Sequence, residues 1–317
     1  MKPDLLLIGG ATEVMLERLD AAFVVHKLSA IPDFDAWAAE HGARVMAVAT
    51  NGHDGVKPHI MAALPALKVI SCYGVGYDAI DTTACVARGI KVSHTPDVLN
   101  AEVANTTLLL LLACFRNFRH DEAWARSGDW EAKGGAPLSS SPDNRTIGIL
   151  GLGRIGQEIA HRLSVFNPTI VYHTRTPKDV PFRHYDNLVT MALDCDVLIC
   201  ITPGGASTHK IVNADVLEAL GPDGVLINVS RGSVVDEDAL IAALESGKLG
   251  KAGLDVFARE PHIPDALKAM DNVVLLPHVG SATVETRAAM GALTVDNLLQ
   301  WLKNGTVRTP VPECAHL

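Results

Sequence analysis

The chain has no cluster of basic residues, and its 317 residues carry a formal net charge of −9. Binding the phosphates of a nucleic acid requires clustered lysine and arginine, so this charge balance argues against a nucleic-acid partner. The longest apolar run, LLLLLACF at 108–115, is well short of the roughly 18 residues that a membrane span needs. The N-terminal segment also lacks the pattern of a signal peptide. We therefore expect a soluble, cytoplasmic protein with no nucleic-acid or membrane partner.

Cysteine pairs of the CxxC type are also absent, although the chain contains six cysteines. Their spacing does not match that of metal ligands either. In a chain of this length, such cysteines are most simply reduced and partly buried thiols of a cytosolic protein. We therefore expect no metal site.

What the chain does have is a regular alternation of short apolar runs and segments of helical length. Runs rich in Val, Ile and Leu and bounded by turn residues are typical of buried parallel strands in βαβ units. The expected strands form two successive sets, at 5–9, 23–28, 45–50, 68–72 and 90–94, and then at 146–151, 169–174, 196–202, 224–230, 251–257 and 272–278. We predict an α/β fold of two Rossmann-like, doubly wound parallel sheets, a flavodoxin-like substrate domain and an NAD(P)-binding Rossmann domain, with an interdomain cleft.

Two long helical patterns set the expected domain limits. Residues 95–128 begin beside a proline and are interpreted as one long, apolar helix, and residues 281–305 as a helix that ends at Gly305. A return of the second helix to the first sheet makes the first domain discontinuous. The substrate-binding domain is then expected to comprise residues 1–97 and 287–317, and the dinucleotide-binding domain residues 98–286.

The segment GLGRIG directly follows an expected strand and opens an expected helix. In a G-x-G-x-x-G turn, the glycines allow the tight turn, the approach of a pyrophosphate to the backbone, and close packing of helix on strand. A structural turn or a loop for S-adenosylmethionine are the alternatives, but the strand and helix on either side favour a dinucleotide. The loop residues expected to contact the cofactor are Gly151, Leu152, Gly153, Arg154, Ile155 and Gly156.

An acidic residue is missing where a ribose-binding carboxylate would be expected, about 20 residues after the first glycine. The segment there is HTRTP (173–177), and the first acid after it is Asp179. Arg175, flanked by Thr174 and Thr176, would instead form charge-assisted hydrogen bonds with a 2′-phosphate. The alternatives are a solvated loop arginine or one that stacks on adenine. We predict that NADPH is the preferred cofactor, with NADH also possible.

Three candidate catalytic residues follow later strands, where ligands bind in open α/β sheets. Arg231 offers a planar fork of donors that suits the carboxylate and carbonyl oxygens of a 2-oxo acid. His278 can donate a proton to the carbonyl oxygen, and Glu260 would hold the His278 ring and favour its charged form. Each has a structural alternative: a salt bridge for Arg231, a loop cap for His278 and a surface turn for Glu260.

The motifs that carry these residues are NVSRGSVVDEDAL (228–240), GLDVFAREP (253–261) and LLPHVGSAT (276–284). Together with GLGRIG and SCYGVGYDAID (71–81), they resemble those of the D-isomer-specific 2-hydroxyacid dehydrogenases over essentially the whole chain. The glyoxylate/hydroxypyruvate reductase and hydroxyphenylpyruvate reductase branch is the most similar. The resemblance implies reduction of a small 2-oxo acid to the D-2-hydroxy acid with a nicotinamide cofactor, the same three catalytic roles, and a homodimer formed through the cofactor domain. With the Arg175 segment, the predicted cofactor is NADPH.

The resemblance also bears on substrate and cofactor contacts. Formate dehydrogenases of the same superfamily carry glutamine in the role of Glu260, so Glu260 favours a 2-hydroxyacid over formate. Asp255 is expected to accept a hydrogen bond from the nicotinamide carboxamide. The remaining expected cofactor contacts are Thr202, Pro203, Thr208, Val229, His278 and Gly280.

The substrate carboxylate is expected at YGVG (73–76), where successive backbone N–H groups would form an anion-binding nest, unless these glycines only make a turn. Asn51, at the end of the third expected strand, is a further candidate. The substrate-binding residues expected in all are Asn51, Gly74, Val75, Gly76, Arg231 and His278. An aryl-pyruvate reductase and a cofactor-sensing binding protein, like the C-terminal-binding-protein corepressors, are alternative functions. Whether Trp130 reaches a neighbouring active site or only packs is also open.

Overall fold

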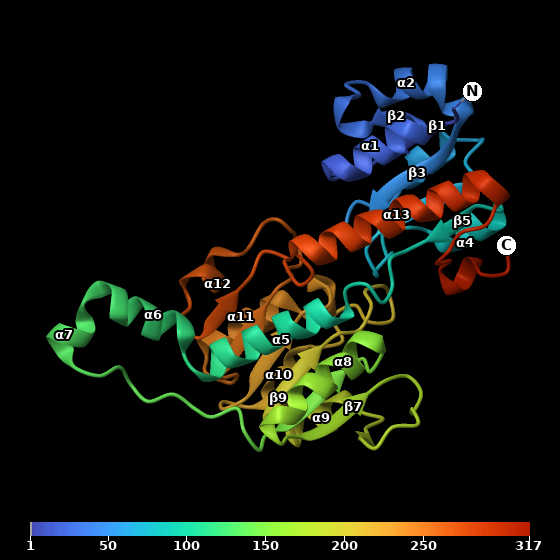
Figure 1. Cartoon of the computed structure of the whole chain (residues 1–317). Coiled ribbons are helices and arrows are strands. Elements are labelled where there is room, and N and C mark those ends of the chain that lie inside the picture. Colours follow the sequence, from blue (N-terminus) through green and yellow to red (C-terminus); the bar gives the residue numbers. More distant parts are fainter. Residues whose placement is uncertain (1) are drawn as a thin grey trace. The chain divides into compact units, whose positions relative to one another are not determined.

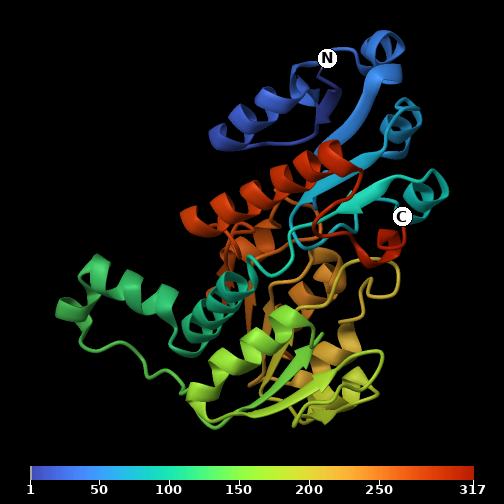
Figure 2. The same ribbon diagram turned by 45° about the vertical axis from the view of Figure 1, so that its right-hand side comes forward.

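The computed structural model describes residues 2–317, which form two compact units (Figure 1, Figure 2). Unit 1 runs to Leu99 and resumes at Thr283–Leu317, and unit 2 is Asn100–Ala282. The chain leaves unit 1 where helix α5 (Asn100–Phe115) begins and returns just before helix α13 (Val284–Asn304).

Unit 1 contains a five-stranded parallel sheet in the order β2-β1-β3-β4-β5. This is the flavodoxin-like strand order, so the expected fold of the first sheet is confirmed. Its strands are β1 (Asp4–Leu7), β2 (Val24–Lys27), β3 (Val45–Asn51), β4 (Val69–Tyr73) and β5 (Lys91–Ser93). Its helices besides α13 are α1 (Glu13–Ala22), α2 (Phe34–His41), α3 (Pro58–Ala62) and α4 (Thr82–Ala87).

Both faces of this sheet are buried, because alternate residues of its strands enter two separate cores. Leu6 and Ile70 belong to one core, whereas their chain neighbours Leu5 and Val69 belong to the other, which also contains Leu298 of α13. Helix α13 therefore covers the same face as α1, although most of the chain separates the two helices (Figure 1). Burial on both faces explains the continuous apolar runs of the central strands β1, β3 and β4.

Helix α13 confirms the expected C-terminal helix at 281–305. Thr283 is its N-cap and accepts a hydrogen bond from the backbone N–H of Thr286, and Gly305 ends it at φ 75°. A residue at this left-handed φ satisfies the last carbonyls of a helix, and glycine adopts it without a steric penalty.

Unit 2 contains a seven-stranded parallel sheet in the order β12-β11-β10-β9-β6-β7-β8. From β8 onwards this is the 3-2-1-4-5-6 order of a dinucleotide-binding fold, extended by β12, and the second predicted sheet is also confirmed. Its strands are β6 (Thr146–Leu150), β7 (Thr169–His173), β8 (Arg183–His184), β9 (Val197–Cys200), β10 (Val225–Asn228), β11 (Lys251–Leu254) and β12 (Val273–Leu275). Strand β8 was not expected, because two residues are too short to show a period.

Helices cover both faces of the second sheet. Helix α5 contacts β10, β11 and α8, whereas α9, α10 and α11 contribute to the core on the opposite face. The bounds of the helices in this unit, besides α5, are α6 (Phe118–Ser127), α7 (Asp129–Lys133), α8 (Arg154–Leu163), α9 (Leu188–Leu193), α10 (Ala214–Leu220), α11 (Glu237–Glu245) and α12 (Asp265–Ala269).

The prediction of one helix over 95–128 is wrong. Asp97 has a left-handed φ of 70°, and regular helix begins only at Asn100. Asn117 is also left-handed, with φ 48°, and separates α5 from α6. Lys251 of β11 stabilises this break, because its Nζ donates hydrogen bonds to the Cys114 carbonyl at 2.9 Å and to Asn117 Oδ1 at 2.6 Å. A tertiary contact thus stabilises the break inside the span predicted as one helix.

Helices α6 and α7 extend away from the rest of unit 2 (Figure 1, Figure 2). None of the helices formed by residues 2–317 combines the length and apolarity needed to cross a lipid bilayer. Across the same residues, no group of three or more His, Cys, Asp or Glu side chains is arranged to hold a metal ion.

Candidate active site

The expected cofactor and catalytic residues of unit 2 follow the carboxyl ends of its strands. Loop 202–208 follows β9, Val229 and Arg231 follow β10, Asp255 follows β11, and His278 follows β12. The glycine loop follows β6. Because the strands are parallel, these segments lie along one edge of the sheet, and the strand order reverses between β6 and β9. Ligands of open α/β sheets bind at this type of position.

The three glycines of the loop have distinct environments. Gly151 has φ 100°, and a Cβ on it would lie 2.8 Å from the Ile201 carbonyl oxygen. A Cβ on Gly156 would lie 2.3 Å from the Gly151 carbonyl oxygen, so these two positions require glycine for the turn and for helix packing. A Cβ on Gly153 would meet no atom within 4 Å, and α8 has no side-chain cap there. The loop therefore leaves the N-terminus of α8 open, which fits a dinucleotide pyrophosphate.

The other three loop residues differ in burial. Leu152 is buried in the protein, Ile155 is half-buried, and Arg154 is exposed on the first turn of α8. The Leu152 side chain packs in the core, so only its backbone is available to a ligand.

The loop that carries Arg175 is held by hydrogen bonds on both sides. His184 Nε2 donates to the Thr174 carbonyl at 2.9 Å, and the backbone N–H of Lys178 donates to the Tyr172 hydroxyl at 2.8 Å. Tyr172 is fully buried on β7 and His184 lies on β8, so the loop is anchored to two neighbouring strands. This bracing holds Arg175 beyond the carboxyl end of β7.

Polar groups in this loop remain available to a ligand. The Thr174 hydroxyl donates to the Thr176 carbonyl at 2.8 Å, so its proton is engaged. Among residues 2–317, neither the Thr176 hydroxyl nor the exposed Arg175 guanidinium has a hydrogen-bond or ion-pair partner. These two side chains can therefore bind an anion without losing a contact within the protein.

Loop 202–208 is closed on itself. The Thr208 hydroxyl donates to the Pro203 carbonyl at 2.7 Å, so Thr208 shapes the loop. Thr202 is half-buried and Pro203 is exposed. Val229, the first residue after β10, is buried, and its N–H donates to the Cys200 carbonyl at 3.2 Å.

Arg231 is held in a turn that the buried side chain of Asn228 organises. Asn228 Oδ1 accepts from the backbone N–H of Ser230 at 3.1 Å and from its hydroxyl at 2.7 Å, while Nδ2 donates to the Arg231 carbonyl at 3.1 Å. Gly232 follows, where a Cβ would lie 1.9 Å from the Phe257 carbonyl carbon. The Arg231 turn therefore lies directly against the segment that leads to Glu260.

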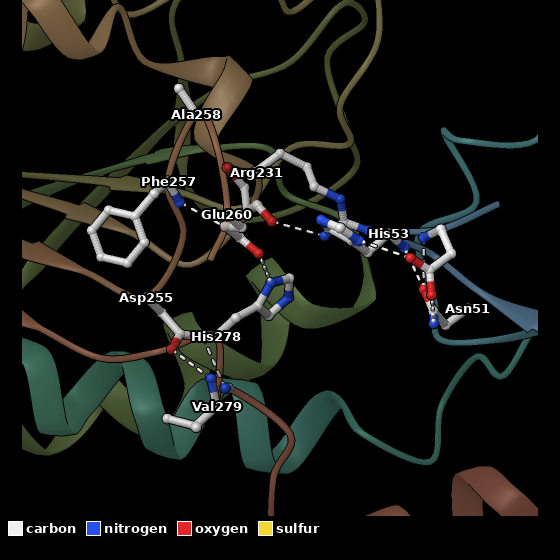
Figure 3. Close-up of polar contacts among 12 residues, drawn as sticks. Asn51, His53, Arg231, Asp255, Phe257, Ala258, Glu260, His278 and Val279 are labelled. Atoms are coloured by element: carbon white, nitrogen blue, oxygen red, sulfur yellow. Dashed lines mark hydrogen bonds and ion pairs between the residues drawn. The ribbon is translucent and has the colours of Figure 1, made fainter. Parts of the chain in front are cut away.

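Glu260 and His278 form a close pair (Figure 3). His278 Nδ1 lies 2.6 Å from Glu260 Oε2, and Glu260 Oε1 accepts from the backbone N–H of Phe257 at 3.0 Å. Because an ionised carboxylate only accepts hydrogen bonds, Nδ1 carries the proton and Nε2 is the nitrogen left for exchange with a ligand. The Glu260 side chain is 16% exposed and that of His278 42%, so the pair has one protected and one accessible end.

Asp255 fixes the backbone that carries His278. Its carbonyl accepts from the N–H of His278 at 2.8 Å, and its two carboxylate oxygens accept from Val279 at 2.7 Å and Gly280 at 2.8 Å. His278 has a left-handed φ of 54°, which is uncommon for a residue with a side chain. Asp255 is 2% exposed, and burial raises the pKa of its carboxyl group. The Asp255 carboxylate thus positions the backbone after His278. Each of its oxygens keeps a further lone pair for the expected contact with a nicotinamide carboxamide.

In unit 1, the Asn51 side chain shapes its own loop. Oδ1 accepts from the backbone N–H groups of His53 at 2.9 Å and Asp54 at 2.8 Å, and Nδ2 donates to Asp54 Oδ2 at 2.7 Å. A Cβ on Gly9 would lie 2.4 Å from both Asn51 Nδ2 and Asp54 Oδ2, so the neighbouring turn requires glycine. Both the amide oxygen and the amide nitrogen of Asn51, expected to bind the substrate, thus have hydrogen-bond partners in this loop.

The YGVG nest has two available amides. The N–H of Gly74 donates to Thr95 Oγ1 at 3.0 Å. Those of Val75 and Gly76 have no acceptor within residues 2–317. Consecutive unpaired N–H groups of this kind can bind a carboxylate.

Sequence reasoning missed the residues that hold the site together: Asn228, Tyr172, His184 and Glu237. Glu237 Oε2 accepts from the N–H of Ala258 at 3.0 Å and supports the segment before Glu260. Asn228 could have been recognised from the sequence, because it is the one polar residue of strand β10, whose sequence is VLIN. The partners of the others lie 6, 10 and 21 residues away along the chain and leave no local pattern.

Comparisons with known proteins identify the relatives of this chain. The model of the family "D-isomer specific 2-hydroxyacid dehydrogenase, NAD binding domain" matches residues 108–280. A glyoxylate/hydroxypyruvate reductase A of Arabidopsis thaliana is 41% identical over 294 residues, covering 92% of this chain and 94% of the relative. A hydroxyphenylpyruvate reductase of Plectranthus scutellarioides is 39% identical, covering 93% and 94%. The crystal structure of an NADPH-dependent glyoxylate/hydroxypyruvate reductase from Sinorhizobium meliloti, in complex with NADP and malonate, superimposes with a TM-score of 0.93 at 46% identity, covering 99% and 98%.

Proposed function

The chain belongs to the D-isomer specific 2-hydroxyacid dehydrogenases, an NAD(P)-dependent enzyme family, and from this premise we propose that it reduces glyoxylate, hydroxypyruvate or a related small 2-oxo acid with NADPH. The product is the D-2-hydroxy acid. The observation that carries the proposal is the His278–Glu260 pair, with Nδ1 and Oε2 at 2.6 Å. A histidine oriented by a half-buried carboxylate, beside an arginine turn and beyond the strand ends, suits carbonyl reduction.

Arg231 binds the substrate in this proposal. Its guanidinium donates to the carboxylate and carbonyl oxygens, which orients the 2-oxo acid and polarises its C=O bond. The Asn228 side chain holds the Arg231 backbone, and the close approach at Gly232 keeps the turn next to Phe257. This preorganisation is expected to lower the cost of placing the reacting carbonyl.

His278 donates the proton from Nε2 to the carbonyl oxygen and accepts it back in the oxidative direction. Glu260 holds Nδ1–H and stabilises the positive charge of the doubly protonated ring. Asp255 keeps the left-handed backbone at His278 in place, so the ring stays aimed as the proton moves. NADPH, when bound, supplies the hydride to the carbonyl carbon.

The preference for NADPH rests on Arg175. Its guanidinium and the Thr176 hydroxyl bind the 2′-phosphate, and no carboxylate at the end of β7 opposes that charge. The hydrogen bond from the Lys178 N–H to Tyr172 and that from His184 to the Thr174 carbonyl hold the loop ready for the phosphate. The S. meliloti structural relative, described as NADPH-dependent and bound to NADP, is consistent with this reading.

A homodimer through unit 2 is part of the proposal. Large apolar side chains are exposed on α6, α7 and the following loop, with Phe118 at 60%, Trp130 at 69% and Leu138 at 99%. Leu109 of α5, the helix that precedes α6, is also 55% exposed. Exposed apolar side chains gathered in one region typically mark a protein interface, and a second copy of this chain would bury them. Sedimentation at micromolar concentration should give twice the mass of the chain.

Steady-state assays test the proposed reaction. We expect turnover of glyoxylate and hydroxypyruvate, with a higher kcat/KM for NADPH than for NADH. Higher efficiency with hydroxyphenylpyruvate would favour the aryl-pyruvate alternative. Tight cofactor binding without turnover of any 2-oxo acid would contradict an enzymatic role and favour a cofactor-sensing binding protein.

A further inference from the structure

The two residues that follow strand β5 hold the YGVG loop by three hydrogen bonds. The Thr95 N–H donates to the Gly74 carbonyl at 2.8 Å, and Thr95 Oγ1 accepts from the Gly74 N–H at 3.0 Å. His94 Nδ1 lies 2.9 Å from the Val75 carbonyl oxygen. The Gly76 carbonyl is held from elsewhere, by Cys72 Sγ at 3.6 Å. All three carbonyls of residues 74–76 therefore have fixed directions.

Fixing these carbonyls also fixes the amides. In a planar trans peptide, the C=O and the following N–H point in opposite directions. The Gly74 carbonyl faces Thr95, so the Val75 N–H points away from Thr95. The Val75 carbonyl likewise faces His94, so the Gly76 N–H points away from His94. These are the two amides of the loop that have no acceptor in residues 2–317.

We propose that His94 and Thr95 are positioning residues that orient the Val75 and Gly76 amides toward the carboxylate of the substrate. The inference rests on the proposed function, since it assigns the loop to a 2-oxo acid. It adds to the proposed site two residues that do not touch the substrate. They act only by fixing the orientation of the peptide planes within residues 74–76. A carbonyl oxygen can only accept a hydrogen bond, so His94 Nδ1 must carry a proton. This condition is met both by the neutral ring that is protonated on Nδ1 and by the charged ring.

Packing prevents the His94 ring and backbone from turning away. The ring is buried and meets Tyr77 edge-on, with centroids 5.3 Å apart. Its backbone N–H donates to the Thr309 carbonyl at 3.1 Å, and its carbonyl accepts from the Thr309 hydroxyl at 2.6 Å. Thr309 is in turn bonded to Asn297, a fully buried residue of α13, at 2.9 and 3.0 Å. A chain of hydrogen bonds thus links helix α13, through Thr309 and His94, to the direction of the Gly76 amide.

The test compares three variants of the full-length enzyme. His94→Phe keeps the aromatic contact with Tyr77 but removes the donor to Val75, whereas His94→Asn restores a donor near the position of Nδ1. His59→Phe, at an exposed position in the same unit, is the matched control. We expect His94→Phe to raise KM for glyoxylate about tenfold, as when one hydrogen bond to a carboxylate is lost. The kcat and the KM for NADPH should change little, because the contact is made equally in ground and transition states.

The inhibition constant of oxalate, used as an unreactive carboxylate probe, should rise in parallel with this KM. His94→Asn should recover most of both values, and His59→Phe should resemble the unmodified enzyme. Unchanged KM and oxalate inhibition in His94→Phe, or a loss confined to kcat, would overturn the proposal. If His94→Phe does not fold, Thr95→Val is judged by the same criteria, since it removes only the acceptor of the Gly74 N–H. An unmodified enzyme inactive on every 2-oxo acid would instead contradict the proposed function.

Discussion

Replacing Glu260 by glutamine tests the histidine pair directly. The two carboxylate oxygens have separate tasks: Oε1 accepts from the Phe257 N–H, and Oε2 accepts from His278 Nδ1–H. Glutamine has one oxygen and one NH2 group, so it can satisfy only one of these donors. If it keeps the Phe257 bond, its NH2 group faces Nδ1. Two donors then face each other, which disfavours the doubly protonated His278 ring that the proposed mechanism requires.

The expected magnitude follows from the burial of the pair. A hydrogen bond to a charged group contributes about 1.5–3 kcal/mol. His278 is 42% exposed, and water screens part of the interaction, so we take the lower end of that range, about 1.5 kcal/mol. Since about 1.4 kcal/mol changes a rate tenfold, kcat for reduction should fall at least about tenfold at neutral pH.

Glu237→Gln is the matched control for this experiment. Glu237 also accepts a hydrogen bond from one backbone N–H of the same segment, that of Ala258 at 3.0 Å. Unlike Glu260, it is not hydrogen-bonded to His278. Stopped-flow measurement of NADPH oxidation at saturating glyoxylate compares the two variants, with thermal melting as a check on folding. A Glu260→Gln enzyme within twofold of the unmodified rate, or an equal loss in both variants, would refute the assigned role.

Three other substitutions or treatments have defined outcomes. His278→Asn should lower kcat for reduction by about 10² or more while NADPH binding, followed by fluorescence, is kept, and a variant with most of its activity would show that the proton comes from another group. Arg175→Ala should lower kcat/KM for NADPH about tenfold and leave that for NADH nearly unchanged, and an unaltered ratio would exclude the phosphate contact. Burial raises the pKa of Cys85, Cys114 and Cys195 to about 12, and all six thiols are buried, so the native enzyme at pH 8 should resist a thiol reagent that labels all six in denaturant. Rapid labelling of the native enzyme would contradict this burial.

Local sequence patterns were sufficient to predict the two sheets and the GLGRIG loop. Each strand of the expected sets has a counterpart in the structure. A central strand buried on both faces needs an unbroken apolar run, which is visible in the sequence. Gly151 and Gly156 could also be predicted from the sequence. Their contacts with Ile201 and with the loop backbone leave no room for a side chain, so the turn requires the glycine spacing that the sequence shows. The candidate catalytic residues could be named because they belong to motifs adjoining such strands.

Hydrogen bonds between distant segments could not be read from the sequence. Lys251 interrupts the helical pattern at Asn117, and the short strand β8 exists because it pairs with β7 and supplies His184 to the Arg175 loop. Asp255 reaches the N–H groups after His278, and His94 reaches the carbonyl of Val75. A polar side chain is compatible with many partners, and only the packed chain selects one. The sequence therefore determines the sheets and the chemical groups at their edges, while tertiary packing decides the direction in which each group points.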